Sequence, residues 1–315
     1  MEPEAGQIPT GSSALELWLA YPGDLAEPAA EAACAAILDD AERARAARFR
    51  FARHRREFLA THALTRVALS HAHPLPPHAW SFSVNQYGKP SPIPGPPRTG
   101  LGPWGGIPGP PRTGLGPWGG IPGPPRTGLG PWGGIPECGL RFNQSNSVEL
   151  AVCLIARPEA RPAALPRAHS GVAAAEVGVD VESFARADGI VPLAVRVFST
   201  AERAQLDALP AAERPSRALS LWTLKEAYIK ARGMGLSLPL QGISFLFNGP
   251  QTIRFEVAPG VDEDPQRWRF CRFDHAGHRI ALAVEAAVAG APEILEVRPP
   301  LGTPTRLAWG SPAWF

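Results

Sequence analysis

The sequence has few cysteines, and none of them forms a metal-binding or disulfide pattern. Its four cysteines are scattered over 315 residues without a Cys-x-x-Cys pair, so neither a disulfide framework nor a zinc site is predicted. No apolar run reaches the roughly 18 residues of a membrane-spanning helix. The first residues, MEPEAGQIPTGSS, lack the basic and apolar regions of a secretion signal. These absences predict a cytoplasmic protein without a membrane segment.

Signatures of nucleotide-binding and nucleic acid-binding proteins are also missing. The chain has neither the Gly-x-Gly-x-x-Gly motif of dinucleotide-binding folds nor a P-loop. Its formal net charge is +2, but a repeated segment contributes three Arg and no acid, and without that segment the charge is −1. A basic surface for nucleic acid is therefore not predicted.

The repeated segment is GPPRTGLGPWGGIP, which occurs three times without change at residues 95–108, 109–122 and 123–136. Each copy has five Gly and four Pro. Pro removes a backbone donor and Gly is costly to order, so neither a helix nor a strand is expected. The period is not that of collagen and is shorter than that of solenoid repeats. A flexible insertion and a ligand for a proline-recognising domain are the two interpretations.

The rest of the chain alternates between strand-like and helix-like segments. Strands are expected at residues 14–21, 80–85, 140–143, 148–156 and 176–183 and in four segments between 244 and 287; helices are expected at 28–50, 52–72, 197–209 (capped at Thr200) and 218–233. The order strand–helices–strands occurs about twice, which predicts an α+β fold with two related halves. Residues 1–176 and 177–295 would form the halves, with a disordered insertion at 91–137 and a loose tail at 296–315.

The segment GVDVE, residues 178–182, places two carboxylates on one side of an expected strand. Residues i and i+2 of a strand point to the same face, so Asp180 and Glu182 project together. Adjacent carboxylates repel each other, and Mg²⁺, which prefers oxygen ligands, would remove that conflict. The alternative is a solvated strand face with two surface acids, and the segment alone does not decide between them.

The segment WTLKEAYIKARG, residues 222–233, is predicted to be a helix that glycine ends. Glu226 and Lys230 are four residues apart, which is typical of an exposed helix pair. In the functional alternative, Glu226 is a third carboxylate at the metal, and Lys225 and Lys230 bind phosphate. Two weaker candidates are FNQSNS (142–147), expected to be a polar turn between strands that could bind phosphate, and the Arg cluster at residues 53, 55 and 56, which a solvated helix face explains equally well.

In their order and spacing, these segments resemble the Sfp-type 4′-phosphopantetheinyl transferases. The matching segments are RFRFARHRREFLATHALTR, YGKP, FNQSNS, GVDVES, FSTAERAQL and LWTLKEAYIKARGMGLSLPL. They run from about residue 45 to about residue 285, apart from the repeats and residues 157–176. The most specific part is GVDVE followed about 40 residues later by WTLKEAYIK.

The resemblance implies two similar α+β halves with the active site in the cleft between them. It implies transfer of the phosphopantetheine arm of coenzyme A to a serine of an acyl or peptidyl carrier protein, with release of adenosine 3′,5′-bisphosphate. The cofactor would be Mg²⁺, or alternatively Mn²⁺. Coenzyme A and the apo carrier protein would be the partners of a monomeric enzyme, with neither a nucleic acid nor a membrane partner. Which carrier protein it serves stays open.

The resemblance also implies roles for single residues. Asp180, Glu182 and Glu226 would be the metal carboxylates, with Glu226 favoured over Glu182 as general base and Lys225 taking part in catalysis. The residues implied at coenzyme A are Arg55, Arg56, Lys89, Pro90, Ser145, Asn146, Ser147, Lys225 and Lys230, with the two arginines placed to within one residue.

Three residues depart from the family pattern. Asn146 stands where the family turn FN-(I/L)-SHS has a His, and Asn cannot carry a positive charge, so we expect coenzyme binding to weaken by about 1–2 kcal/mol. Gln144 replaces an apolar residue, and His62 stands where Arg is frequent. An active transferase and a weakened homologue that mainly binds the carrier or coenzyme A are the two interpretations, and the three carboxylates with both lysines favour the first. A third, a Pro-rich interaction protein on this fold, depends on the repeats alone.

Overall fold

The computed structural model describes residues 14–94, 138–158, 175–249, 252–261, 263–286, 290–298, 301–308 and 314–315. The three repeats and residues 159–174 lie outside these ranges, and so does nearly all of the insertion predicted at 91–137. Its first four residues, 91–94, belong to a strand instead. No helix within the described ranges is both long enough and apolar enough to cross a membrane.

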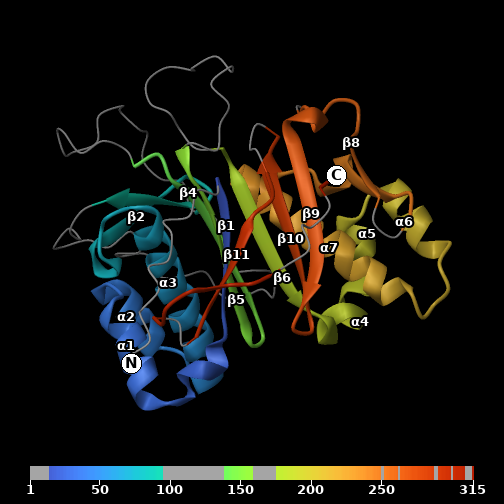
Figure 1. Ribbon diagram of the computed structural model, residues 1–315. Coiled ribbons are helices and arrows are strands. Elements are labelled where there is room, and N and C mark those ends of the chain that lie inside the picture. Colours follow the sequence, from blue (N-terminus) through green and yellow to red (C-terminus); the bar gives the residue numbers. More distant parts are fainter. Residues whose placement is uncertain are drawn as a thin grey trace.

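The first part of the chain is a strand, three helices and four strands (Figure 1). Its elements are β1 (Leu15–Ala20), α1 (Pro28–Ala36), α2 (Asp40–Ala47), α3 (Ala52–Ala72), β2 (Trp80–Val84), β3 (Pro90–Pro94), β4 (Arg141–Ser147) and β5 (Leu150–Ala156). Strands β2 and β3 form a separate hairpin, whereas β1, β5 and β4 are neighbours in one sheet.

The second part repeats this order. Its elements are β6 (Val177–Ser183), α4 (Ala187–Ile190), α5 (Ala194–Val197), α6 (Thr200–Asp207), α7 (Arg214–Arg232), β7 (Ile243–Phe247), β8 (Ile253–Val257), β9 (Trp268–His275) and β10 (His278–Glu285). Here β7 and β8 form the separate hairpin, and the sheet order β6-β10-β9 matches β1-β5-β4. The prediction of an α+β fold with two similar halves is therefore confirmed.

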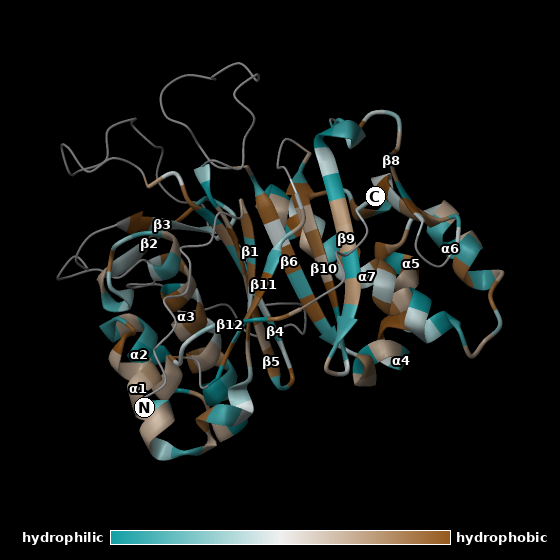
Figure 2. Ribbon diagram, in the orientation of Figure 1, coloured by the Kyte–Doolittle hydropathy of each residue, from teal (hydrophilic) through white to brown (hydrophobic). Residues whose placement is uncertain are grey.

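The two sheets lie between the two long helices, with α3 on one side and α7 on the other (Figure 1). Alternate residues of β1, β5, β6 and β10 point into a core between the sheets, while a second core lies under α3 and a third under α7. The central strands carry mostly hydrophobic colours in Figure 2. Strands β4 and β6, at the edges of their sheets, pack against each other where the halves meet.

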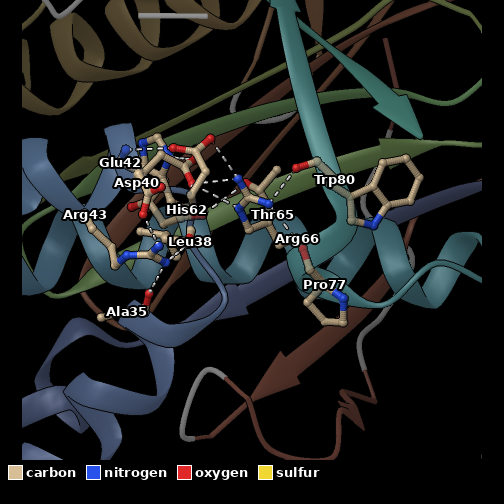
Figure 3. A network of polar contacts seen from close by, with 12 residues as sticks. Ala35, Leu38, Asp40, Glu42, Arg43, His62, Thr65, Arg66, Pro77 and Trp80 are labelled. Carbon is tan, nitrogen blue, oxygen red and sulfur yellow. Dashed lines mark hydrogen bonds and ion pairs between the residues drawn. The ribbon is translucent and has the colours of Figure 1, made fainter. Parts of the chain in front are cut away.

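In the first half, a buried ion pair ties a helix N-terminus to the long helix. The Asp39 side chain and Glu42 form a capping box at the start of α2. The Glu42 carboxylate also accepts from Arg66 Nη2 of α3 at 2.7 Å, and Arg66 Nη1 donates to the Trp80 carbonyl at the start of β2 at 2.7 Å (Figure 3). Burial alone would raise the pKa of Glu42, but His62 and Arg66 outweigh it and lower that pKa to about 2.

The second half contains the same arrangement with a lysine in place of the arginine. Ser199 and Glu202 form the capping box of α6, so the cap is Ser199 and not Thr200 as predicted. Lys225 Nζ of α7 lies 2.9 Å from the Glu202 carboxylate and donates to the Ile243 carbonyl at the start of β7 at 2.7 Å. Arg66 of α3 and Lys225 of α7 are therefore equivalent residues, as are their partners Glu42 and Glu202.

Three further sequence expectations differ from the structure. The helix predicted at 28–50 is two helices, because Asp39 caps a new helix start. The segment FNQSNS is not a turn: it belongs to β4, and the turn lies at Val148 and Glu149, which has φ of 68°. The tail is not loose in its described part, since β11 (Glu293–Val297) pairs in parallel with β1 and antiparallel with β12 (Thr305–Arg306). Backbone bonds between Phe315 and Phe270 hold the last residue.

Candidate active site

Gly178 explains why α7 lies so close to β6. A Cβ atom at this position would come 2.0 Å from the Ala227 carbonyl oxygen and 2.4 Å from the Ala231 nitrogen. Backbone atoms cannot give way as a flexible side chain can, so only glycine allows this approach. The glycine that opens GVDVE thus brings the helix against the strand face that carries the acidic residues.

Strand alternation places Asp180 and Glu182 on the side of β6 that faces α7, while Val179 and Val181 enter the core between the sheets. Both carboxylates are buried, at 4% and 6% exposure. On α7, a stripe with a spacing of four residues faces them, which is the spacing of one helix face. Trp222, Glu226 and Lys230 form this stripe.

Asp180 is the centre of a polar cluster between the two halves. Its Oδ1 accepts a hydrogen bond from Ser145 Oγ of β4 at 2.9 Å and lies 2.6 Å from Lys230 Nζ. Lys230 Nζ also donates to Ser145 Oγ at 2.8 Å. Asp180 Oδ2 is buried and has no hydrogen-bond partner among the described residues, which marks it as a group that a ligand or ion would satisfy.

Glu182 is held by two residues whose contacts the sequence analysis missed. Arg186 Nη1 donates to both carboxylate oxygens, at 2.7 and 2.6 Å, and Trp222 Nε1 donates to Oε1 at 2.9 Å. Trp222 could have been found, because it stands four residues before Glu226 on the stripe. Arg186 follows the end of the strand, where the chain turns, and sequence spacing gave no signal for it. Burial and the neighbouring Asp180 charge raise the pKa of Glu182.

Glu226 carries the strongest electrostatic signal of the site. Burial, followed by the negative charge of Asp180, raises its pKa to about 7, against the opposing charge of Lys230. No hydrogen bond to the Glu226 carboxylate occurs among the described residues. Its carboxyl group is therefore poised to hold or release a proton near neutral pH, as a general base requires.

The three carboxylates do not form a ready-made metal centre. Within the described ranges, no group of three or more His, Cys, Asp or Glu side chains is gathered as a metal ion would need. Instead, Lys230 forms an ion pair with Asp180, and Arg186 forms one with Glu182. The donor set nevertheless fits a divalent cation, because all three groups offer oxygen, their charges repel each other, and Asp180 Oδ2 lacks a partner within the described ranges.

Strand β4 contributes the other wall of the site. Besides Ser145, two of its residues join the halves: Asn143 Oδ1 accepts from the Val179 backbone N–H, and Ser147 Oγ accepts from the Ser183 backbone N–H, at 2.9 and 3.0 Å. FNQSNS thus acts through its side chains rather than as a phosphate-binding turn.

The other two polar residues of this segment, Gln144 and Asn146, lie on the opposite face of β4. Asn146, predicted at coenzyme A, is exposed there. On the same face, Gln144 Oε1 accepts from the Thr65 hydroxyl of α3.

Lys225 does not reach the carboxylates, contrary to the predicted contact with the coenzyme phosphates. Its side chain is fully buried, and its ammonium group is bonded to Glu202 and to the carbonyls of Leu240 and Ile243. Successive helix positions point about 100° apart, so Lys225 faces the core when its neighbour Glu226 faces the site. Burial lowers the pKa of Lys225 although Glu202 opposes this.

The remaining predicted coenzyme contacts are dispersed. Arg55 Nε pairs with Glu31 of α1 at 2.6 Å, and Arg56 is half-buried without a polar partner among the described residues. Lys89 Nζ is engaged by Glu176 and by the Ala231 carbonyl of α7. Pro90 is buried at the start of β3. The structure brings together Ser145, Asp180, Glu182, Glu226 and Lys230, and no described hydrogen bond or ion pair joins the dispersed residues to them.

Comparisons with known proteins bear on the same part of the chain. The profile of the 4′-phosphopantetheinyl transferase superfamily matches residues 176–283. The chain is 26% identical over 225 residues to the 4′-phosphopantetheinyl transferase HetI of Nostoc sp., covering 71% of this chain and 71% of that protein. It is 28% identical over 148 residues to a 4′-phosphopantetheinyl transferase of Bacillus subtilis, covering 47% and 55%.

A solved structure is similar only in part. A holo-(acyl-carrier-protein) synthase from Bacillus anthracis in complex with CoA (3′,5′-ADP) aligns at 16% identity and a TM-score of 0.30, covering 35% of this chain and 94% of that chain. This score is too low to support an inference about the present chain. The match at residues 176–283 includes the carboxylate strand and helix, and together with these relatives it supports the predicted resemblance to Sfp-type 4′-phosphopantetheinyl transferases and to enzymes of that class.

Proposed function

We propose that the protein transfers the 4′-phosphopantetheine group of coenzyme A to a serine of an acyl or peptidyl carrier protein, with Mg²⁺ as cofactor. The observation that carries the proposal is the cluster of Asp180, Glu182 and Glu226 at the junction of the halves, with Lys230 and Ser145 beside Asp180. Buried carboxylates next to a lysine suit a reaction in which a pyrophosphate must be bound and its charge neutralised.

In the proposed reaction, the serine oxygen of the carrier forms a bond to the phosphorus that bears the pantetheine arm. The bond from that phosphorus to the bridging oxygen breaks, and adenosine 3′,5′-bisphosphate leaves with that oxygen. Glu226 accepts the serine proton, because its carboxylate lies beside Asp180 and Lys230 and no hydrogen bond among the described residues competes for it. Lys230 stabilises negative charge on the phosphates.

Mg²⁺ would be held by Asp180, Glu182 and Glu226. When bound, it supplies charge neutralisation at the phosphates of coenzyme A. Asp180 Oδ2, which has no partner among the described residues, could take the cation while Lys230 contacts Oδ1, whereas Arg186 has to release at least one oxygen of Glu182. Lys230 is long enough to turn to a phosphate, and the 52% exposure of the Arg186 side chain gives it room to move.

The test uses fluorescent coenzyme A, Mg²⁺ and an apo carrier protein. Wild type is expected to label the carrier, and Glu226→Gln is expected to label it at least about 100-fold more slowly. Absence of labelling by wild type at high coenzyme concentration would overturn the proposed function. Equal labelling by wild type and Glu226→Gln would overturn the role of Glu226 alone. A cytoplasmic location, a monomeric state and the identity of the carrier stay predictions from the sequence.

A further inference from the structure

The turn between β2 and β3, residues 85–89, packs against the C-terminal end of α7, although the two are far apart in the sequence. Asn85 Nδ2 donates to the Gly233 carbonyl at 2.9 Å, and Lys89 Nζ donates to the Ala231 carbonyl at 2.6 Å. The last carbonyls of a helix have no partner within the helix, and its C-terminus attracts positive charge. The first half therefore caps the helix that carries Glu226 and Lys230.

The Asn85 side chain has two separate tasks. Its Oδ1 accepts from the backbone N–H groups of Tyr87 and Lys89, both at 2.9 Å, which closes the turn. Its Nδ2 is the group that reaches α7. An Asp at this position would keep the acceptor that builds the turn but would replace the donor to α7 with an oxygen. One substitution can thus separate the turn from its contact with the helix.

Gly233 makes the close contact possible. Its φ of +60° lies in the left-handed region, which favours glycine at a helix end. A Cβ atom on this residue would come 2.5 Å from Lys89 Cδ and 3.2 Å from Asn85 Nδ2. In the C-terminal half of the helix, Gly178 of β6 allows a second close contact, with Ala227 and Ala231. Glu226 and Lys230 lie on the stretch of helix that these two contacts fix.

We propose that Asn85 and Lys89 are positioning residues, which act through α7 to hold Glu226 and Lys230 in place for the reaction. This proposal rests on the proposed function, and it gives the YGKP turn a task other than direct contact with coenzyme A. Because the contacts are made to helix carbonyls, their loss should allow the end of α7 to shift. A shift of the reacting groups lowers the rate of the chemical step more than it weakens binding of the substrate.

The chain offers a matched control in its other half. Asn248 follows β7 as Asn85 follows β2, and its backbone N–H bonds to the Thr252 carbonyl as that of Asn85 bonds to Lys89. Asn248 is exposed, and no hydrogen bond joins it to the end of α3 among the residues that the structure covers. Asn248→Asp makes the same chemical change without touching a helix that carries site residues.

The experiment compares Asn85→Asp, Lys89→Met, Lys89→Arg and Asn248→Asp with wild type in the full chain. For Asn85→Asp, kcat is expected to fall about 10- to 100-fold, while KM for coenzyme A changes less than about twofold. Lys89→Met should behave in the same way, Lys89→Arg should recover part of the loss, and Asn248→Asp should stay within about twofold of wild type. A raised KM for coenzyme A with unchanged kcat would overturn the proposal in favour of direct coenzyme contact.

A second readout does not depend on activity. Hydrogen exchange of the amides at residues 229–233 should be faster in Asn85→Asp, with no change in α3, and Asn248→Asp should match wild type. Unchanged exchange in both Asn85→Asp and Lys89→Met would show that Asn85 and Lys89 do not hold the end of α7, and it would overturn the proposal even if the enzyme is active. If wild type fails to label a carrier while exchange responds as expected, the proposed function is wrong. Asn85 and Lys89 would then still hold the end of α7, but without a role in catalysis. If one variant does not fold, the other gives the same test.

Discussion

The two halves of the molecule use the same positions for different purposes. Arg66 of α3 and Lys225 of α7 hold equivalent buried carboxylates. Five residues further along each helix stand His71 and Lys230, and both reach a carboxylate on the first strand of their own half. The equivalent carboxylates are Glu16 of β1 and Asp180 of β6.

The surroundings of these two carboxylates differ. Glu16 is fully buried and accepts from Arg157 and the Trp18 indole in addition to its contact with His71. Burial by itself would raise its pKa, but hydrogen bonds from His71 and Arg157 outweigh this and lower it. Asp180 instead has an oxygen without a partner in the part of the chain that the structure describes, and two further acids lie close by. A duplicated scaffold thus has one closed polar cluster that stabilises and one unsatisfied cluster that can react.

The largest expected effect contrasts these two carboxylates in activity. Asp180→Asn should lower the rate of carrier labelling about 100- to 1,000-fold, because under the proposed function it removes a negatively charged ligand of the metal ion. Glu16→Gln should leave the rate per folded molecule within about twofold of wild type. Labelling rates, corrected for the folded fraction by circular dichroism, check this. A comparable rate loss in both variants would contradict the claim that only the carboxylate cluster of the second half takes part in the reaction.

The buried cations should matter about equally in both halves. Arg66→Met and Lys225→Met each leave a buried carboxylate without its partner, so each should lower the free energy of unfolding by about 3–5 kcal/mol. Urea denaturation measures both. If Lys225→Met kept wild-type stability but lost activity, Lys225 would be a catalytic residue as the sequence predicted, and its structural role would be refuted.

Gly178 allows the close approach of α7 to β6, and β1 has no glycine that would do the same for α3. A substitution that adds a Cβ atom should therefore disturb this packing in the second half alone. Gly178→Ala forces a Cβ atom into helix backbone and should cost about 1–3 kcal/mol or more of stability, together with a loss of activity because Glu226 shifts. Thermal unfolding and labelling measure the two effects. A variant with normal stability and activity would contradict the packing described for Gly178.

Acid should weaken the first half through Glu42. Its pKa is lowered to about 2 from the usual 4.5, so its contribution is complete above about pH 4.5 and disappears as the pH falls toward about 2. The difference in free energy of unfolding between wild type and Glu42→Gln should therefore shrink steadily below about pH 4.5. A difference that stays constant between pH 6 and pH 3 would show that the ionised carboxylate does not stabilise the fold.

The smallest expected effect concerns the repeats. Deletion of two copies of GPPRTGLGPWGGIP should leave activity and melting temperature nearly unchanged, since each doubling of a flexible loop adds only about 0.6 kcal/mol of closure cost. Labelling and thermal unfolding compare the shortened chain with the full one. A large drop in either quantity would make the repeats part of the structure rather than an insertion.

Sequence patterns predicted what depends on local periodicity. The helix expected at 52–72 has those limits in the structure, and strand alternation correctly paired Asp180 with Glu182. Sequence patterns failed where contacts between distant parts of the chain determine the local structure or the direction of a side chain. Lys225 and Lys230 look alike in the sequence, but only the packing of α7 sends one to the core and the other to the site. FNQSNS is polar like a turn, yet it is a strand whose backbone pairs with β5, and the side chains of Asn143, Ser145 and Ser147 bond to the other half.

The YGKP turn and Arg186 illustrate the same limit. Lys89 contacts a helix end 142 residues away in the chain, and no local signal marks such a partner. Arg186 reaches Glu182 only because the chain turns after β6. The order and spacing of several motifs nevertheless predicted the family, since each motif was ambiguous alone but the combination was specific.

The most direct test of the account is the mass of an apo carrier protein after incubation with coenzyme A, Mg²⁺ and the enzyme. We predict that wild type adds the mass of one phosphopantetheine group at the carrier serine, that Asp180→Asn does not do so within the same time, and that Glu16→Gln does. A carrier left unmodified by wild type, or modified equally fast by Asp180→Asn, would contradict the claim that the carboxylates of the second half perform the reaction.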